Sequence, residues 1–353
     1  MIRSLLLLLF ASSVALVLTG CQYEDPDPYT APVAVVGGSL DPDQLNRGRE
    51  AYVLYCYACH GMEGDGDGPA SYGLRPAPRD FRNGMFKFVG VAEGLPHDED
   101  LKRIIKDGLN GTAMLPWEDI PDPQIDDIVQ YLKVLSYYSE DEDGEVDAAG
   151  WMDTEDGEIG ERAVAGEDPW GVGNSADAIK RGEAVYHGQA NCQQCHAAFI
   201  TKPEIKAAYK ATNNGKEMTA EFRPDLYEPL IQLSEYTVAV REPLAFKAST
   251  CTEDDDCSGD DTMCVYGKCS RKLKVLPPDF TFNELRSVYP GTELEDLFRI
   301  VAHGIQGSGM PAWKLQGIGD KDLWALSYYV QSLTKLKGTS AALDLKKRLK
   351  AQE

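Results

Sequence analysis

Two short segments of this sequence combine a pair of thiols with an imidazole at the same spacing. They read Cys56-Tyr57-Ala58-Cys59-His60 and Cys192-Gln193-Gln194-Cys195-His196. Cys-x-x-Cys-His is the attachment motif for c-type haem, in which both thiols bond to the porphyrin and the histidine binds the iron. A thioredoxin-like cysteine pair would follow a strand, and a zinc site would need a fourth converging ligand. We therefore predict two haem c groups, attached through Cys56, Cys59, Cys192 and Cys195, with His60 and His196 as axial ligands.

The surroundings of the two motifs also repeat. The matching segments are Arg47-Gly48 and Arg181-Gly182, Tyr52 and Tyr186, Pro78-Arg79-Asp80-Phe81 and Pro277-Pro278-Asp279-Phe280, and Asp100-Leu101 and Asp296-Leu297. Apolar residues follow a helical period, and each copy ends in an apolar helix, at 124–135 and 320–333. The second copy contains about 63 additional residues between its histidine and the Pro-Asp-Phe match. The sequence thus predicts two similar helical domains, the second with an insertion.

Each copy places a methionine in a glycine-containing turn that precedes a tryptophan, Met114 before Trp117 and Met310 before Trp313. A thioether opposite an imidazole stabilises ferrous iron and raises the reduction potential. Because these methionines occupy the same place in both copies, Met114 and Met310 are predicted as the sixth ligands. His97 and His303 are alternative ligands, although His303 is expected to lie at the surface or beside the ligands.

These residues resemble the class I cytochrome c family over residues 43–138, 176–200 and 275–335. The resemblance implies an all-α fold, in which an opening helix crosses a closing helix and a methionine loop covers the haem. Gly48 and Gly182 match the glycine of that crossing. Pro69 resembles the proline whose carbonyl accepts the N–H of the haem histidine, whereas the second copy lacks a Gly-Pro pair at that spacing.

The amino-terminal residues resemble an export signal. A basic Arg3 precedes the uncharged run 4–20, and Leu18-Thr19-Gly20-Cys21 resembles the lipobox of bacterial lipoproteins. We expect a signal peptide at 1–20, lipidation of Cys21, a tether at 21–42 and a location on the periplasmic side of a bacterial membrane. A retained membrane helix is the alternative. Together with the two haem motifs, this predicts a two-domain, dihaem lipoprotein cytochrome c.

The charge distribution divides the chain further. The net charge is −22, and residues 139–170 hold 13 acidic residues and one arginine. This composition predicts an extended, self-repelling linker at 139–175, between a first haem domain at 43–138 and a second at 176–335. The insertion is placed at about 203–272 and a charged tail at 336–353.

The remaining cysteines lie in the insertion, at Cys251, Cys257, Cys264 and Cys269. An even, closely spaced set in an exported protein suggests two disulfides, with three pairings open. A structural metal at these cysteines, or calcium at the neighbouring aspartates, is less favoured because no spaced calcium-binding pattern is present.

The predicted function is one-electron transfer by two haems, in a carrier or a subunit of a respiratory complex, and not enzymatic catalysis. A dihaem peroxidase and a haem-sensing or docking subunit are the alternatives. The expected partners are redox proteins, either a basic soluble cytochrome or a respiratory complex, together with the membrane through the lipid anchor. No nucleic acid and no small-molecule substrate is expected.

Overall fold

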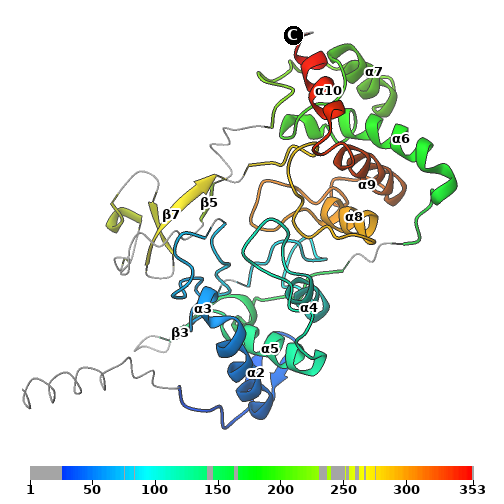
Figure 1. The fold of residues 1–353 in the computed structure, drawn as a ribbon. Helices are drawn as coiled ribbons and strands as arrows, with labels where there is room; N and C mark the ends of the chain where they lie inside the picture. The colour runs from blue at the N-terminus through cyan, green and yellow to red at the C-terminus, as the bar shows by residue number, and fades with distance from the viewer. Residues whose placement is uncertain are drawn as a thin grey trace, which may run out of the picture.

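The computed structural model describes residues 26–351 apart from 75, 83, 141–145, 163–165, 230–236, 240–250, 252–253, 259–261, 266–267 and 275. The described chain is mostly helical, with a few short strands, which confirms the predicted all-α class (Figure 1). Within these residues, no helix is both long and apolar enough to cross a bilayer. The predicted signal peptide and Cys21 lie outside the described residues.

The first repeat consists of four helices, α2 (Pro42–Tyr55), α3 (Tyr57–His60), α4 (Asp98–Asp107) and α5 (Asp122–Val134). Local signals fix their ends: the Asp41 carboxylate accepts a hydrogen bond from the Gln44 amide at 3.0 Å, and Pro42 occupies the first turn of α2. Helix α4 starts with three acidic residues and ends at Gly108, whose φ is +67°.

The second repeat contains α6 (Ser175–His187), α8 (Glu293–His303) and α9 (Asp320–Thr334), with the short 3-10 segments η2 (Val172–Asn174) and η3 (Cys192–Gln194). Helix α7 (Lys202–Thr212) begins the insertion, and α10 (Ser340–Lys350) follows α9. Each repeat has its own apolar core, built on α2 and α5 in the first and on α6, α8 and α9 in the second.

The opening and closing helices cross at a glycine in both repeats. A Cβ at Gly48 would lie 2.2 Å from the Asp127 carbonyl oxygen, and one at Gly182 would lie 2.0 Å from that of Ala325. Beside each crossing two tyrosine rings pack together, with centroids 5.3 Å apart for Tyr52 and Tyr131 and 5.4 Å apart for Tyr186 and Tyr329. Any larger residue at these glycines would force the helices apart.

The segment predicted as a tether is instead part of the first repeat from residue 26 onward. Strands β1 (Val33–Val35) and β2 (Gly38–Leu40) form a hairpin whose Val35 and Leu40 are buried. The Asn46 side chain bonds to both the amide and the carbonyl of Tyr29, at 2.9 Å each. The prediction of a free tether did not take these apolar residues into account. Burying their side chains contributes more free energy than is lost as conformational entropy when the proline-rich chain becomes ordered.

The acidic segment is also packed and is not an extended linker. Strands β3 (Tyr138–Glu140) and β4 (Val146–Ala148) form a hairpin, and η1 (Gly150–Met152) buries Trp151 in the first core. Further on, the Leu95 amide donates to the Glu158 carbonyl and the Gly160 amide to the Leu95 carbonyl. Acidic side chains such as Glu155 and Glu158 remain exposed, so the main chain packs while the charges stay solvated.

The carboxyl-terminal tail is a helix and is not a free charged segment. Helix α10 buries Ala342 and Leu349, and Leu349 packs with Ile205 of α7 in a small separate cluster. Lys346 pairs with Glu228 at 2.5 Å, which ties the tail to the insertion. The charged composition hid an amphipathic face, and α7 and α10 lie side by side at one end of the molecule (Figure 1).

The disulfide-containing part of the insertion is a small sheet at the side of the molecule (Figure 1). Its strands are β5 (Thr237–Ala239), β6 (Thr262–Val265) and β7 (Lys268–Lys274), in the order β5-β7-β6, with η4 (Asp254–Asp256) before β6. The pairing left open by the sequence is Cys251–Cys264 and Cys257–Cys269. Because these bonds use all four sulfurs, the alternative of a metal at the cysteines is not supported.

The two repeats contact each other through equivalent loops. The Asn110 side chain, beside Met114, donates to the Val288 carbonyl of the second repeat at 2.7 Å. The Gln306 side chain, at the equivalent place beside Met310, donates to the Gly94 carbonyl of the first repeat at 2.9 Å. The contact is therefore roughly two-fold symmetric and brings both methionine loops to the boundary between the repeats.

Candidate functional site

The first candidate site begins where α2 ends. Cys56 terminates α2, and the turn of α3 then carries Cys59 and His60. Both cysteines are free, half-buried thiols, and burial raises the pKa of Cys56 to about 12. The Tyr52 hydroxyl donates to the Gly61 carbonyl at 2.6 Å, which fixes the turn after the histidine.

The second candidate site has the same layout. Asn191, with φ of +52°, turns the chain into η3, which carries Cys192 and leads to Cys195 and His196. Both thiols are free, and burial raises the pKa of Cys192 to about 12. The Tyr186 hydroxyl donates to the Ala197 carbonyl at 2.8 Å, as Tyr52 does to Gly61 in the first repeat.

The two histidines are held by one nitrogen each. His60 Nδ1 lies 3.1 Å from the Arg79 carbonyl oxygen, and His196 Nδ1 lies 3.1 Å from that of Pro278. Burial lowers the pKa of both rings to about 4, so they are neutral near pH 7. With Nδ1 occupied as a donor, Nε2 is left to bind a metal, which is the arrangement that orients ligating histidines.

The expected partner of His60 was the carbonyl of Pro69, and the structure gives Arg79 in its place. Arg79 and Pro278 occupy the same position in the repeated Pro-x-Asp-Phe segment. The following phenylalanine stacks on the imidazole in both repeats, with centroids 4.4 Å apart for Phe81 and 4.7 Å apart for Phe280. This segment therefore positions the histidine in both repeats, which is why the second can lack the Gly-Pro pair.

The two methionine loops have the same pattern of internal hydrogen bonds. The Met114 amide donates to the Thr112 hydroxyl at 3.1 Å and its carbonyl accepts from the Leu109 amide at 2.8 Å. The Met310 amide donates to the Ser308 hydroxyl at 3.3 Å and its carbonyl accepts from the Ile305 amide at 3.2 Å. Equivalent loops thus present equivalent thioethers, and the assignment of both as iron ligands stays a prediction.

The other histidines have distinct roles. His97 Nε2 lies 2.9 Å from the Gly160 carbonyl, which occupies that nitrogen. His303 is buried rather than exposed, with Nδ1 2.9 Å from the Arg299 carbonyl and with no partner for Nε2 among the described residues. His187 was not considered from the sequence; it is fully buried, and its two nitrogens bond to the Glu183 carbonyl and the Phe199 amide.

The main chain of the motif is supported differently in the two repeats. In the first, the Gly66 amide donates to the His60 carbonyl at 2.8 Å, and Gly66 needs its φ of +77° to do so. In the second, Arg223 of the insertion donates to the carbonyls of Gln193 and His196, at 2.8 Å each. Sequence analysis missed Arg223 because nothing in its local pattern marks a residue that acts on a turn 27 positions away.

A group of cations lies near the first histidine. Arg79, whose carbonyl holds His60, Lys87 and Arg286 are close enough for their charges to repel. Burial, followed by Arg79 and Arg286, lowers the pKa of Lys87 to about 8. Each haem carries two carboxylates, so this group of cations fits that cofactor, as do the two thiols, the oriented imidazole and the thioether of each repeat.

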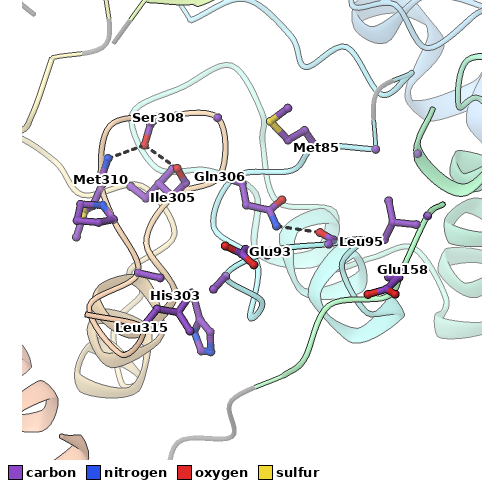
Figure 2. Close-up of a pocket in the computed structure, with 18 of the residues that line it drawn as sticks. Met85, Glu93, Leu95, Glu158, His303, Ile305, Gln306, Ser308, Met310 and Leu315 are labelled. Atoms are coloured by element: carbon purple, nitrogen blue, oxygen red, sulfur yellow. Dashed lines mark hydrogen bonds between the residues drawn. The ribbon is translucent and has the colours of Figure 1, made fainter. Parts of the chain in front are cut away.

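A cavity of about 610 Å³ lies between the repeats, and Figure 2 shows the side chains that line it. Met85 and Glu93 come from the first repeat, Glu158 from the packed acidic segment, and His303 and Met310 from the second repeat. The bond from Gln306 to Gly94 crosses the cavity (Figure 2). The second methionine loop thus faces the first repeat.

Comparison with known proteins agrees with this geometry. Residues 43–132 match the family model described as cytochrome c oxidase, cbb3-type, subunit III. The first repeat is a cytochrome c domain. A cytochrome c domain implies covalently bound haem c and electron transfer by that haem.

A solved structure resembles a larger part of the chain. A chain of the Kuenenia stuttgartiensis reducing HAO-like protein complex is 23% identical, with a TM-score of 0.50. The alignment covers 81% of this chain and 95% of that chain, so the shared fold extends beyond the first repeat. The comparison with curated proteins found no match. The c-type cytochrome predicted from the motifs is supported, and the second haem and the lipid anchor stay predictions.

Proposed function

We propose that the protein is a dihaem electron carrier, with one haem c in each repeat. Cys56, Cys59 and His60 would hold the first haem, with Met114 as its sixth ligand. Cys192, Cys195, His196 and Met310 would hold the second. The haem supplies the one-electron redox step when it is bound, and the chain attaches it, orients its ligands and limits its exposure to water.

The equivalence of the two histidine sites carries this proposal. In both repeats a tyrosine hydroxyl fixes the turn after the histidine, a Pro-x-Asp-Phe carbonyl accepts from Nδ1, and a phenylalanine stacks on the ring. A second motif without a haem would have no reason to keep a neutral imidazole with Nδ1 engaged and a free thiol pair beside it. The shared geometry therefore favours two equivalent haems.

Haem content tests the proposal directly. The purified full-length chain should contain two covalent haems per polypeptide, measured as the pyridine haemochrome against protein concentration. Replacing Cys56 and Cys59 by alanine should leave one, and so should replacing Cys192 and Cys195. A wild-type content of one haem would contradict the proposal.

Carrier and peroxidase differ in ligand occupancy. Two methionine-ligated irons leave no position for peroxide, so the half-reduced protein should stay low-spin and turn over hydrogen peroxide no faster than a carrier cytochrome. A high-spin haem that appears on half-reduction, together with rapid peroxide turnover, would favour the peroxidase alternative.

The proposed location is the periplasmic side of a bacterial membrane, with a lipid on Cys21. The support is the lipobox-like Leu18-Thr19-Gly20-Cys21 and the need for haem c attachment outside the cytoplasm. Several acyl chains on one cysteine would give stable anchoring, which one chain does not. Cys21→Ser should release a haem-loaded protein into the soluble fraction; a variant that stays membrane-bound after a high-salt wash would indicate a retained helix instead.

The proposed partner is a basic redox protein, either a soluble cytochrome or a component of a respiratory complex. The support is the net charge of −22, because opposite charge accelerates encounter. Electron exchange with a basic cytochrome should slow steeply as salt rises. A rate that does not change with salt would remove this partner class.

A further inference from the structure

Arg223 connects the insertion to the second haem motif. Its Nε donates to the Gln193 carbonyl and its Nη2 to the His196 carbonyl, at 2.8 Å each. Its Nη1 donates to the Asp225 carbonyl at 2.9 Å, and Nη2 also reaches the Glu228 carbonyl. The guanidinium is therefore anchored between the insertion and the turn that carries Cys192, Cys195 and His196.

All described hydrogen bonds of Arg223 go to main-chain carbonyls, and none goes to a carboxylate. Arginine keeps its charge at every physiological pH. A half-buried positive charge thus lies on the motif, and no carboxylate in the described part of the chain is hydrogen-bonded to it, in a protein whose net charge is −22.

The first repeat satisfies the same carbonyls without a charge. The Gly61 amide donates to the Tyr57 carbonyl at 2.9 Å, and the Gly66 amide donates to the His60 carbonyl at 2.8 Å. Tyr57 and Gln193 are equivalent, and so are His60 and His196. Two neutral amides are therefore enough to satisfy this turn, and the positive charge is what the second repeat adds.

The charge reaches the ligands of the second site. Arg223 Nη2 lies 2.8 Å from the carbonyl oxygen of His196, so the positive charge lies beside the residue predicted to bind the iron. Ferric haem carries one more positive charge than ferrous haem. A fixed cation near the iron therefore disfavours the ferric state, more strongly where water is excluded.

We propose that Arg223 is a positioning residue that holds the second haem motif in place and raises the reduction potential of the second haem. This inference rests on the proposed function, because it requires a haem at Cys192 and Cys195. Residues of the insertion would then tune the redox chemistry of the second repeat.

The test compares both haems in one full-length protein by spectroelectrochemical titration. The two reduction waves are first assigned with chains in which one motif has lost its cysteines. Arg223→Leu should lower the reduced-to-oxidised ratio of the second haem about tenfold at a fixed applied potential, as expected for one partly screened charge, and should leave the first haem unchanged. Arg223→Lys should keep most of the wild-type ratio, because the charge remains.

Two further variants separate charge from support. Arg223→Gln keeps a hydrogen-bond donor without the charge, so it should resemble Arg223→Leu in potential even if Leu prevents maturation of the second haem. Arg181→Leu removes an α6 arginine that pairs with Asp322 at 2.7 Å, and it should have little effect on either wave.

Three results would overturn the inference: an unchanged second wave in both Arg223→Leu and Arg223→Gln, equal shifts of both waves, or a shift in Arg223→Lys as large as that in Arg223→Leu. Haem content distinguishes these outcomes from failure of the proposed function. A wild-type chain with haem only at Cys56 and Cys59 would refute two haems, whereas an unchanged wave in a two-haem variant refutes only the role of Arg223.

Discussion

The two repeats hold the same five-residue motif with different hydrogen-bond donors. In the first, a glycine-rich loop folds back so that neutral amides, such as that of Gly66, bond to the carbonyls of the motif. In the second, the guanidinium of Arg223, a residue of the insertion, donates to the equivalent carbonyls. In both repeats the main-chain carbonyls of the motif accept hydrogen bonds, but the groups that donate these bonds differ.

The two repeats share the residues that pack around the predicted haem ligands. Both repeats keep the tyrosine at the turn, the phenylalanine on the imidazole and the glycine at the helix crossing. They differ in the donors to the motif and in the environments of Asp100 and Asp296, which are equivalent buried aspartates. Each repeat can therefore serve as a control for the other.

The helix crossings should be the most sensitive positions. Gly48→Ala and Gly182→Ala each place a Cβ 2.2 Å or closer to a carbonyl oxygen, so the helices must separate. Each should cost more than about 3 kcal/mol of unfolding free energy, because overpacking at a backbone contact cannot be relieved by a rotamer. Gly173→Ala, where an added Cβ meets no atom within 4 Å, is the control.

Thermal unfolding monitored by circular dichroism, with haem content measured for each variant, checks this prediction. Gly48→Ala should impair the first haem site and Gly182→Ala the second. Wild-type melting of either glycine variant would show that the crossing tolerates a side chain.

The two buried aspartates should respond differently to the same change. Asp296 accepts from the Arg299 guanidinium at 2.6 Å, the Thr292 hydroxyl at 2.8 Å and the Tyr289 amide at 3.1 Å. Among the described residues, the Asp100 carboxylate has no hydrogen-bond partner, and the Arg103 guanidinium is 3.8 Å away. Asp296→Asn should therefore cost about 3 kcal/mol, and Asp100→Asn less than about 1 kcal/mol. Chemical denaturation measures both values, and equal losses would contradict this difference.

The methionine loops should be interchangeable in their effect. If both thioethers bind iron, Met114→Ala and Met310→Ala should each lower the potential of one haem by the order of 0.1 V, or about 2 kcal/mol, within the range that axial ligands control. The weak charge-transfer absorption of methionine-bound ferric haem should be lost for the same haem. Met85→Ala, at the cavity between the repeats, serves as the control and should retain both bands; an unaltered spectrum in either loop variant would exclude that methionine as a ligand.

Lys87 should give the smallest effect, and one that depends on pH. Its folded pKa is about 8, below the ordinary value of 10.5, so the unfolded chain binds more protons between these values. The stability of the haem-free protein should therefore rise between pH 8 and 10.5, by at most about 2 kcal/mol after allowing for solvent screening. The equivalent residue in the second repeat is Arg286, an arginine, so the second repeat has no lysine at this position.

Urea denaturation of the haem-free chain across this pH range, compared with Lys87→Met, isolates the contribution. The rise should be absent in Lys87→Met and reduced in the haem-loaded protein, where carboxylates would stabilise the ammonium. A fall in stability over the same range in the wild type alone would reverse the sign and refute the assignment.

Some of this architecture follows from the sequence because chemistry restricts it. A thiol pair followed by histidine has few uses, and the matched offsets between the two copies are enough to locate the methionine turns and the closing helices. Gly48 and Gly182 were interpretable for the same reason, because only glycine allows two helices to approach this closely.

Other features could not be predicted from the sequence. The composition of a segment does not show which of its residues lie on a buried face. The acidic segment looked like a free linker, yet one tryptophan, Trp151, and a few main-chain bonds attach it to the first repeat. The charged tail concealed the apolar side of α10. Pro69 was assigned by resemblance alone, whereas the residues that position His60 and His196 depend on a contact made 19 and 82 positions along the chain.

The packed acidic segment also limits how far the repeats can move apart. Arg162 pairs in a bridge with Val91 of the first repeat, and the Asp168 carboxylate accepts from the Tyr328 hydroxyl of the second. Six residue steps separate these two attachments, which span at most about 22 Å when fully extended. Such a short connecting segment gives each repeat a high effective concentration near the other, so a small interface is sufficient to keep the repeats together. Exchange of electrons between the proposed haems would accordingly be a unimolecular event, whose rate does not depend on the concentration of the protein.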